Sequence, residues 1–171
     1  MSKAKSKMEW CLRKAEKELK ESGSHRGLVE SEPDFNKARE HIKKAERYLN
    51  ATEFINKGGY SDIATGTVFY AMYHCLLAIS VKNGYESRNQ ECTFALMNQL
   101  IEDKKIDFGK GILDRIALAE PKDGEETEKT SVKIRERFQY GTEFNVEENL
   151  YEELVDLAKE VISMAKVIIE K

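Results

Sequence analysis

The most apolar stretch of the chain runs from Ile63 to Val81 and contains no Asp, Glu, Lys or Arg. Because 35% of all residues are charged, this run marks a segment that is removed from water. Its apolar side chains lie nearly all round a helix, which predicts a buried central helix rather than a surface one. A run of about 20 apolar residues can also span a bilayer, but Thr, Gly, Tyr and His interrupt this one, so no membrane contact is expected.

Apolar residues that recur every three to four positions predict three further long helices. The first covers residues ~4–21, and its narrow apolar stripe fits a helix outside the bundle or against a second subunit. The second ends at Gly58-Gly59, and its short link to the central helix makes the two antiparallel. The last closes the chain with an apolar stripe that reaches Ile168.

Capping residues mark where these helices should begin. Ser31 can cap the second helix, with Pro33 in its first turn. Ser61 can cap the central helix. Asn145 with Glu148 three positions later resembles a capping box, which predicts the start of the closing helix.

Shorter apolar patterns predict three more helical segments, and polar connections separate them. The helical segments contain residues 94–101, 108–116 and 132–138, and the connections are residues 85–90 and a mobile loop at residues 121–130. No segment alternates apolar and polar residues with the period of two that is typical of a strand.

The predicted fold class is therefore all-α, an antiparallel up-and-down helical bundle of four main helices with short extra helices. A length of 171 residues fits a single domain. Within it, residues 1–30 form a basic N-terminal helix and loop, and residues 31–171 form the bundle.

Charge is distributed unevenly along the chain, whose net charge is −3. Residues 1–26 carry eight Lys or Arg and four Asp or Glu, whereas the remainder is acidic. A basic N-terminus could contact phosphate or an acidic partner. It could equally be a solvated helix face, because glutamates such as Glu9 and Glu16 interleave with the lysines, and this second interpretation is favoured.

The three cysteines, Cys11, Cys75 and Cys92, are odd in number and scattered, with no CxxC pair. This pattern argues against a disulfide framework and against a zinc site, and it favours a reducing compartment. The lysine-rich N-terminus shows no apolar core of a secretory signal. We therefore expect a cytoplasmic protein.

Two groups of residues could carry chemistry. Tyr70 and His74 are four positions apart on the central helix and share a face, with Tyr73 beside them. A half-buried His next to a Tyr could bind a ligand or relay a proton, although a histidine with a purely structural hydrogen bond is the favoured interpretation.

The second group is Arg135, Arg137 and Tyr140, near the predicted helix end at Gly141. Two guanidinium groups suit a phosphate oxyanion, and a neighbouring aromatic ring suits base stacking. The alternative is a charged, solvated helix face, and the pattern does not decide between the two.

Familiar catalytic motifs are missing from the sequence. It contains no GxxxxGK[ST], GxGxxG, HExxH or GxSxG pattern. With three His in the whole chain and no carboxylate–histidine spacing of a di-iron bundle, we expect neither a metal site nor a cofactor.

The central helix and its surroundings resemble the HEPN domain family of small prokaryotic helical bundles. The resemblance covers residues 35–171 and is carried by FYAMYH at residues 69–74, residues 76–78, Gly84-Tyr85, residues 38–60 and the Arg-to-Tyr segment at residues 135–140. It implies a homodimeric helical bundle. Many members are metal-independent ribonucleases of toxin–antitoxin or defence systems that use an Arg followed four to six residues later by His, and others bind nucleotides or pair with a small nucleotidyltransferase.

This chain departs from that pattern because no His occurs after His74, and Tyr140 stands where the spacing from Arg135 would place one. A His with a pKa near neutrality can accept and return the proton of a 2′-hydroxyl, whereas Tyr does so poorly. Three hypotheses follow. The first is a homodimeric module that binds nucleotide or RNA, the second an active ribonuclease, and the third a ligand-free structural dimer.

Overall fold

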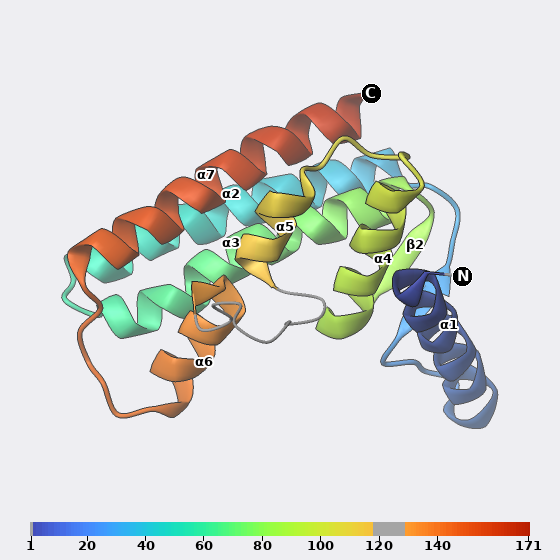
Figure 1. Cartoon of the computed structure of the whole chain (residues 1–171), viewed down its shortest axis with the longest axis horizontal. Helices are drawn as coiled ribbons and strands as arrows, with labels where there is room; N and C mark the ends of the chain where they lie inside the picture. Colours follow the sequence, from blue (N-terminus) through green and yellow to red (C-terminus); the bar gives the residue numbers. More distant parts are fainter. Residues whose placement is uncertain (1, 118–128) are drawn as a thin grey trace.

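The computed structural model describes residues 2–117 and 129–171. In these residues the chain forms seven helices and one two-stranded sheet, which confirms the all-α prediction (Figure 1). The elements are α1 (Lys3–Ser22), β1 (Leu28–Glu30), α2 (Phe35–Lys57), α3 (Ser61–Lys82), β2 (Tyr85–Ser87), α4 (Gln90–Glu102), α5 (Lys110–Ile116), α6 (Ser131–Tyr140) and α7 (Glu148–Glu170).

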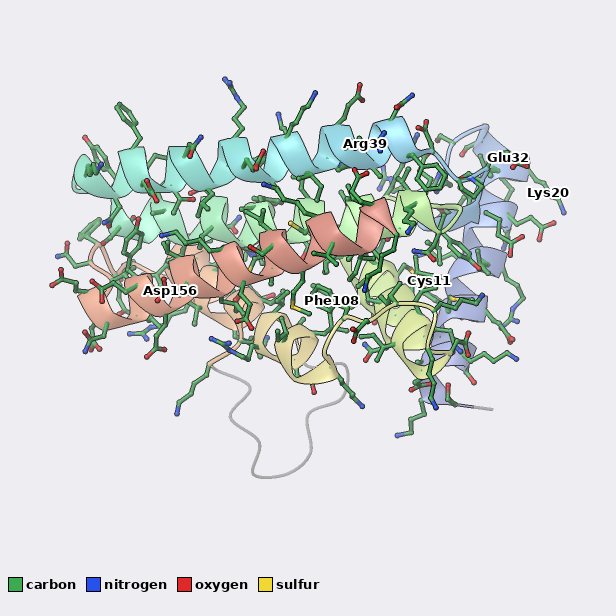
Figure 2. The ribbon with its side chains drawn as sticks, turned by 90° about the horizontal axis from the view of Figure 1, so that it is seen from above. Cys11, Lys20, Glu32, Arg39, Phe108 and Asp156 are labelled. Atoms are coloured by element: carbon green, nitrogen blue, oxygen red, sulfur yellow. A yellow bond between two sulfur atoms is a disulfide. The ribbon has the colours of Figure 1, made fainter. Side chains whose placement is uncertain are left out.

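Helix α3 forms the centre of the molecule, as its charge-free sequence predicts. It packs against α2 and α7 along its length and against α6 and α4 elsewhere (Figures 1 and 2). Its fully buried side chains include Val68, Phe69, Met72, Leu76 and Ile79. Among the described helices, α3 is the one long and apolar enough to cross a membrane, and 67% of its most apolar window is buried inside the protein. Its apolar character is thus accounted for by the core of the bundle.

Helices α2 and α3 form an antiparallel hairpin whose turn includes Gly59. The backbone of Gly59 has a φ of 86°, in the left-handed region that glycine adopts without strain. Helix α7 then packs against both members of the hairpin. At the far end of this layer Arg39 of α2 forms two hydrogen bonds to the carboxylate of Glu170, at 2.7 and 2.8 Å.

The predicted cap of α2 is wrong by one turn. The N–H of Ser31 donates to the carbonyl of Gly84, so the chain is still extended at this point and cannot yet begin a helix. Helix α2 begins after Asp34, whose carboxylate accepts the N–H of Lys37 at 2.9 Å. Pro33 therefore precedes the helix.

The other two predicted caps are also wrong. Ser61 is the first residue of α3, and its hydroxyl accepts the N–H of Val146 at 2.9 Å. This bond ties the connection between α6 and α7 to the start of α3. Helix α7 begins at Glu148 after Glu147, with no side-chain cap, so Asn145 does not form the predicted capping box.

The prediction that the chain contains no strand is wrong. Strands β1 and β2 pair antiparallel, with Leu28 opposite Ser87 and Glu30 opposite Tyr85. Three-residue strands are too short to show a period of two, and their partners are far apart in sequence. The three shorter predicted helices are present as α4, α5 and α6. The predicted mobile loop falls mainly on residues 118–128, outside the described residues.

Helix α1 lies outside the bundle, where it packs on α4 and β1 (Figure 1). Its buried residues are Cys11 and Ala15, and a Cβ added to Gly27 would lie 3.1 Å from the Cβ of Ala15. Glycine thus permits the close approach of this loop to the helix. The division of a single domain into residues 1–30 and residues 31–171 stays a prediction.

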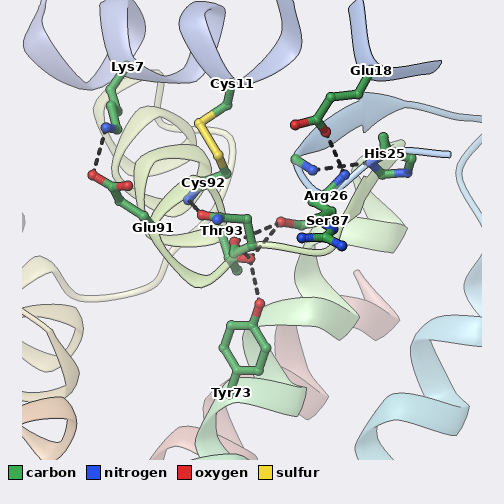
Figure 3. Close-up of a disulfide and its surroundings, with 12 residues drawn as sticks. Lys7, Cys11, Glu18, His25, Arg26, Tyr73, Ser87, Glu91, Cys92 and Thr93 are labelled. Carbon is green, nitrogen blue, oxygen red and sulfur yellow. Dashed lines mark hydrogen bonds and ion pairs between the residues drawn. A yellow bond between two sulfur atoms is a disulfide. The ribbon is translucent and has the colours of Figure 1, made fainter. Parts of the chain in front are cut away.

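A disulfide joins Cys11 of α1 to Cys92 of α4, with the Cα atoms 5.8 Å apart (Figure 3). The cysteine pattern argued against a disulfide framework and gave no sign of this bond, because helix packing brings together residues separated by 81 positions. Cys75 is free and buried in α3. The disulfide removes the cysteine pattern as an argument for a reducing compartment, and the cytoplasmic location stays a prediction.

Loss of the disulfide should loosen α1, because this helix buries few other side chains. Replacing Cys11 and Cys92 together by Ala should lower the free energy of unfolding by about 2–5 kcal/mol, the range expected for a bridge that closes a long loop. Urea unfolding with and without reductant measures this. Reductant should shift the wild-type midpoint and leave that of the double variant unchanged, and equal responses of the two proteins would contradict the prediction.

Candidate functional site

Arg135 lies on the inner face of α6, turned toward α3. Thr130 caps the helix by accepting the N–H of Lys133, and α6 ends before Gly141. This placement leaves the guanidinium carbon of Arg135 4.5 Å from the ring centroid of Phe69. Only 8% of the residue is exposed, so a permanent positive charge is held against the aromatic core.

The charge of Arg135 is poorly compensated by the described residues. Its Nε atom is buried without a hydrogen-bond partner. The carboxylate contact is Glu136, whose Oε1 lies 4.0 Å from a terminal guanidinium nitrogen, at the limit for an ion pair. A buried cation without a close anion costs free energy, so this position favours the arrival of an anion.

Arg137 and Tyr140 lie elsewhere on α6. Arg137 forms two hydrogen bonds to the carboxylate of Glu143, at 2.8 and 2.6 Å, in a region where both side chains are about half exposed. The hydrogen bond from Arg137 lowers the pKa of Glu143. Tyr140 is 77% exposed. The structure therefore does not bring the two arginines together, because residues two positions apart point to different sides of a helix.

The three residues proposed on α3 also diverge. Tyr73 is buried, and its hydroxyl lies 3.0 Å from the hydroxyl of Thr93 on α4 (Figure 3). Burial raises the pKa of Tyr73, which keeps its phenol neutral. Tyr70 and His74 instead face α2 on the outer side of the hairpin.

On that outer side His74 meets two residues of α2 that the sequence analysis missed. The Nδ1 atoms of His41 and His74 are 3.0 Å apart, so one of them must donate and the other accept. The ring of Tyr48 stacks on His74 with a centroid distance of 5.3 Å. His41 and Tyr48 are seven positions apart, two helical turns, which is the signal that could have placed them on one face.

Ring contacts connect the two groups of residues into a continuous chain. Its links, given as distances from the guanidinium carbon or between ring centroids, are Arg135–Phe69 at 4.5 Å, Phe69–Tyr70 at 5.4 Å, Tyr70–Tyr48 at 5.8 Å, Tyr48–His74 at 5.3 Å and His74–His41 at 5.3 Å. We call this set the aromatic chain. It runs across the α3 surface from α6 to α2, with the buried cation at one end and the paired imidazoles at the other.

Both imidazoles are held in the neutral form. Burial lowers the pKa of His74 to about 4, and the positive charges of a protonated His41 and of Lys44 add to the effect. Burial also lowers the pKa of His41, with Lys37 acting in the same direction and Glu40 against it. At neutral pH the pair therefore shares a single hydrogen-bonding proton and carries no charge.

The groups gathered in this region have the chemistry to bind an anion and to stack on a planar ring. Among the described residues no group of three or more His, Cys, Asp or Glu side chains is placed to hold a metal ion. The thiol of Cys75 is buried, and burial raises its pKa far above the usual value. What the region offers is one unsatisfied cation and a series of stacked rings.

The neutral state of the histidine pair predicts a pH dependence of stability. Because the folded-state pKa of His74 is lowered from about 6.5, the unfolded chain binds more protons between pH 6.5 and pH 4, and stability should fall as pH falls through this window. With allowance for the partial exposure of the ring, His74 should contribute about 1–2 kcal/mol to this loss.

Two measurements check this. The imidazole resonances of His74 should titrate near pH 4, and a midpoint at or above 6.5 would contradict the prediction. The free energy of unfolding of the His74→Gln variant should vary less than that of wild type between pH 6.5 and pH 4. This comparison isolates the imidazole from the carboxylates that titrate over the same range.

Comparison with known proteins identifies a family for this chain. The family model of the HEPN domain matches residues 38–168, from the first turn of α2 almost to the end of α7. No curated protein matches the sequence. The match includes the whole aromatic chain and α6, whereas α1 and β1 precede it.

Proposed function

Because this chain belongs to the HEPN family, we propose that it is a homodimeric regulatory module that binds the phosphate of a nucleotide or of RNA. The observation that carries the proposal is the Arg135 guanidinium, which is 8% exposed and lacks a hydrogen-bond partner at Nε. A phosphate oxyanion would supply the charge-assisted hydrogen bonds that this group does not find within the described residues.

The residues beside Arg135 favour a nucleotide over a bare phosphate ion. Phe69 lies beneath the guanidinium, and Tyr70 is the next ring of the aromatic chain, with 36% of its surface exposed. Tyr70 faces α2 and is separated from the guanidinium by Phe69, so it would stack on the base of a nucleotide that extends past Phe69 from a phosphate at Arg135. Arg137 contributes less, since Glu143 already holds its guanidinium through two hydrogen bonds.

The proposed homodimer would use the outer face of the α2–α3 hairpin. Five residues of α3 that are not fully buried form an uncharged stripe, spaced alternately by four and three positions: Ile63, Thr67, Tyr70, His74 and Leu77. Within it Ile63 is 56% exposed. A second copy placed on this stripe would cover its apolar surface and bring a second aromatic chain alongside the first.

The ribonuclease hypothesis stays the alternative, and the geometry of one chain gives it less support. His74 contacts α2, whereas Arg135 contacts the side of α3 that faces α6, so no imidazole lies beside the guanidinium. Tyr140 keeps the family's spacing but is 77% exposed. A small nucleotidyltransferase is a further partner that membership of the family leaves open.

The binding proposal is tested by replacing Arg135 with Met, which can still fill the space above Phe69. We expect the variant to remain folded, because an apolar residue of similar length removes the cost of an uncompensated buried charge. Its affinity for a short single-stranded RNA and for a nucleoside triphosphate should fall by about tenfold or more, the loss expected for a charge-assisted phosphate contact. Fluorescence anisotropy measures both affinities.

The matched control is Arg137→Met on the same helix, which should change affinity by less than about threefold because Arg137 is already paired with Glu143. Equal affinities of wild type and Arg135→Met would overturn the proposal. Incubation of the RNA without metal tests the alternative. Cleavage by wild type that is lost in both Arg135→Met and Tyr140→Phe would establish the ribonuclease.

The dimer is tested with Ile63→Glu, which places a charge on the most exposed residue of the uncharged stripe, at its N-terminal end. The variant should sediment as a monomer at concentrations where wild type is a dimer. Lys43→Glu, an exposed change on α2 outside the stripe, is the control and should leave the dimer intact. A monomeric wild type would contradict this part of the proposal.

A further inference from the structure

Helix α1 carries a basic stripe that is visible only once the helix is oriented. Lys3, Lys7, Trp10, Lys14 and Lys17 follow one another at steps of four, three, four and three, so they lie in a row along one face. We call this row the Trp10 ridge. It is separate from the row that faces α4, which includes Met8, Cys11 and Ala15 and lies about 100° further round the helix.

The indole of Trp10 stands between two lysines of the ridge. The Nζ atom of Lys7 is 4.6 Å from the ring centroid and that of Lys14 is 5.1 Å from it. Cation–π contacts of this kind hold the ring in place while leaving much of it open to solvent. Trp10 is 44% exposed, an unusual state for the largest apolar side chain.

The glutamates of α1 do not neutralise the ridge in the way that their alternation with lysines in the sequence implied. Glu9 and Glu16 pair with Arg13 and Lys20, none of which belongs to the ridge. Within the ridge, Lys7 pairs with Glu91 at 2.6 Å, and Lys17 pairs with Glu21 at 3.7 Å. These carboxylates are more than 60% exposed, so the pairs are weak and can exchange for another anion.

The ridge lies beside the face of α1 that packs on α4, and its Lys7 reaches Glu91 in the first turn of α4. The disulfide between Cys11 and Cys92 fixes α1 at the level of Trp10, and the close contact with Gly27 fixes the next turn (Figure 3). Helix α1 lies at the end of the molecule opposite α6 (Figure 1). The ridge therefore cannot be part of the Arg135 site of the same chain.

We propose that the Trp10 ridge is a second binding site, one for single-stranded nucleic acid. Trp10 stacks on a base, and the lysines on either side contact the phosphates that flank it. From Lys3 to Lys17 the ridge extends about 21 Å, enough for about six stacked nucleotides. The site thus goes beyond the proposed function, which concerns Arg135.

Nucleic acid fits the ridge better than a membrane surface does. A helix that lies in a membrane interface buries a broad apolar face in the lipid. On α1 the apolar row at Met8, Cys11 and Ala15 is turned toward α4, and the ridge offers one aromatic ring among four lysines. A single aromatic ring with lysines on both sides can stack on one base while the lysines contact the phosphates on either side of that base.

The chain provides its own probe, since Trp10 is its only tryptophan. A 12-nucleotide unstructured RNA and the matching single-stranded DNA are titrated into the full-length protein while indole fluorescence is recorded. Stacking should quench the emission, and the affinity should weaken with salt. If RNA and DNA quench the indole fluorescence equally, the site recognises the phosphates and bases that both share. If RNA alone quenches, the 2′-hydroxyl is recognised as well.

Variants distinguish binding at the Trp10 ridge from a general effect of the positive charge of α1. Lys14→Glu with Lys17→Glu should weaken binding by about tenfold or more and reduce the salt slope by more than about one. Lys5→Glu with Lys20→Glu makes the same charge change on the same helix but off the ridge, and it should change affinity by less than about twofold. The Trp10→Ala variant, whose binding is measured with a labelled oligonucleotide, should lose about fivefold or more in affinity.

Three outcomes would overturn the proposal. They are an indole emission that no oligonucleotide changes, equal losses from the two double-lysine variants, and a blue shift with anionic phosphatidylserine vesicles in the absence of oligonucleotide binding. The Arg135→Met variant keeps this test distinct from the first one. Quenching of Trp10 should persist in it, so failure at one site leaves the other site separately measurable.

Discussion

The burial of most of α3 is the constraint on which the rest of this structure depends. A helix whose residues 63–81 carry no charge must be largely enclosed, and no single neighbour can enclose it. Helices α2 and α7 cover two of its sides, α6 and α4 cover parts of the others, and the side chains of Phe69, Met72 and Leu76 fill the space between them. The positions of the shorter helices follow from this need.

Enclosure also determines how polar groups behave along α3. Ser80 donates to the carbonyl of Leu76, and Thr65 donates to that of Asp62, so buried hydroxyls are satisfied within the helix itself. Tyr73 is satisfied by Thr93. The buried Nε of Arg135 differs from these hydroxyls because it has no hydrogen-bond partner among the described residues. An anion bound at this position would supply the missing hydrogen bond and compensate the buried charge.

Helix α1 obeys a different physical rule. It is attached through a narrow row of apolar side chains, of which only Cys11 and Ala15 are fully buried, and through a covalent bond. An attachment of this kind keeps most of the helix surface, including much of Trp10, in water. The bundle and α1 thus present cationic groups of two kinds, a buried arginine at one end and lysines on the outer helix at the other.

The sequence by itself determined the helices, because the period of apolar residues and the lack of charge in Ile63–Val81 report directly on burial. It also identified Arg135, Tyr70 and His74 as residues of interest. Only the tertiary structure decided which of them meet: Arg135 turned inward onto Phe69, Arg137 turned outward to Glu143, and His41 and Tyr48 arrived beside His74 from another helix. The disulfide, the short strands and the α7 cap escaped prediction for the same reason. Each depends on contacts between segments distant in sequence, or on a chain direction set by such contacts. The local pattern of apolar and polar residues cannot predict these contacts.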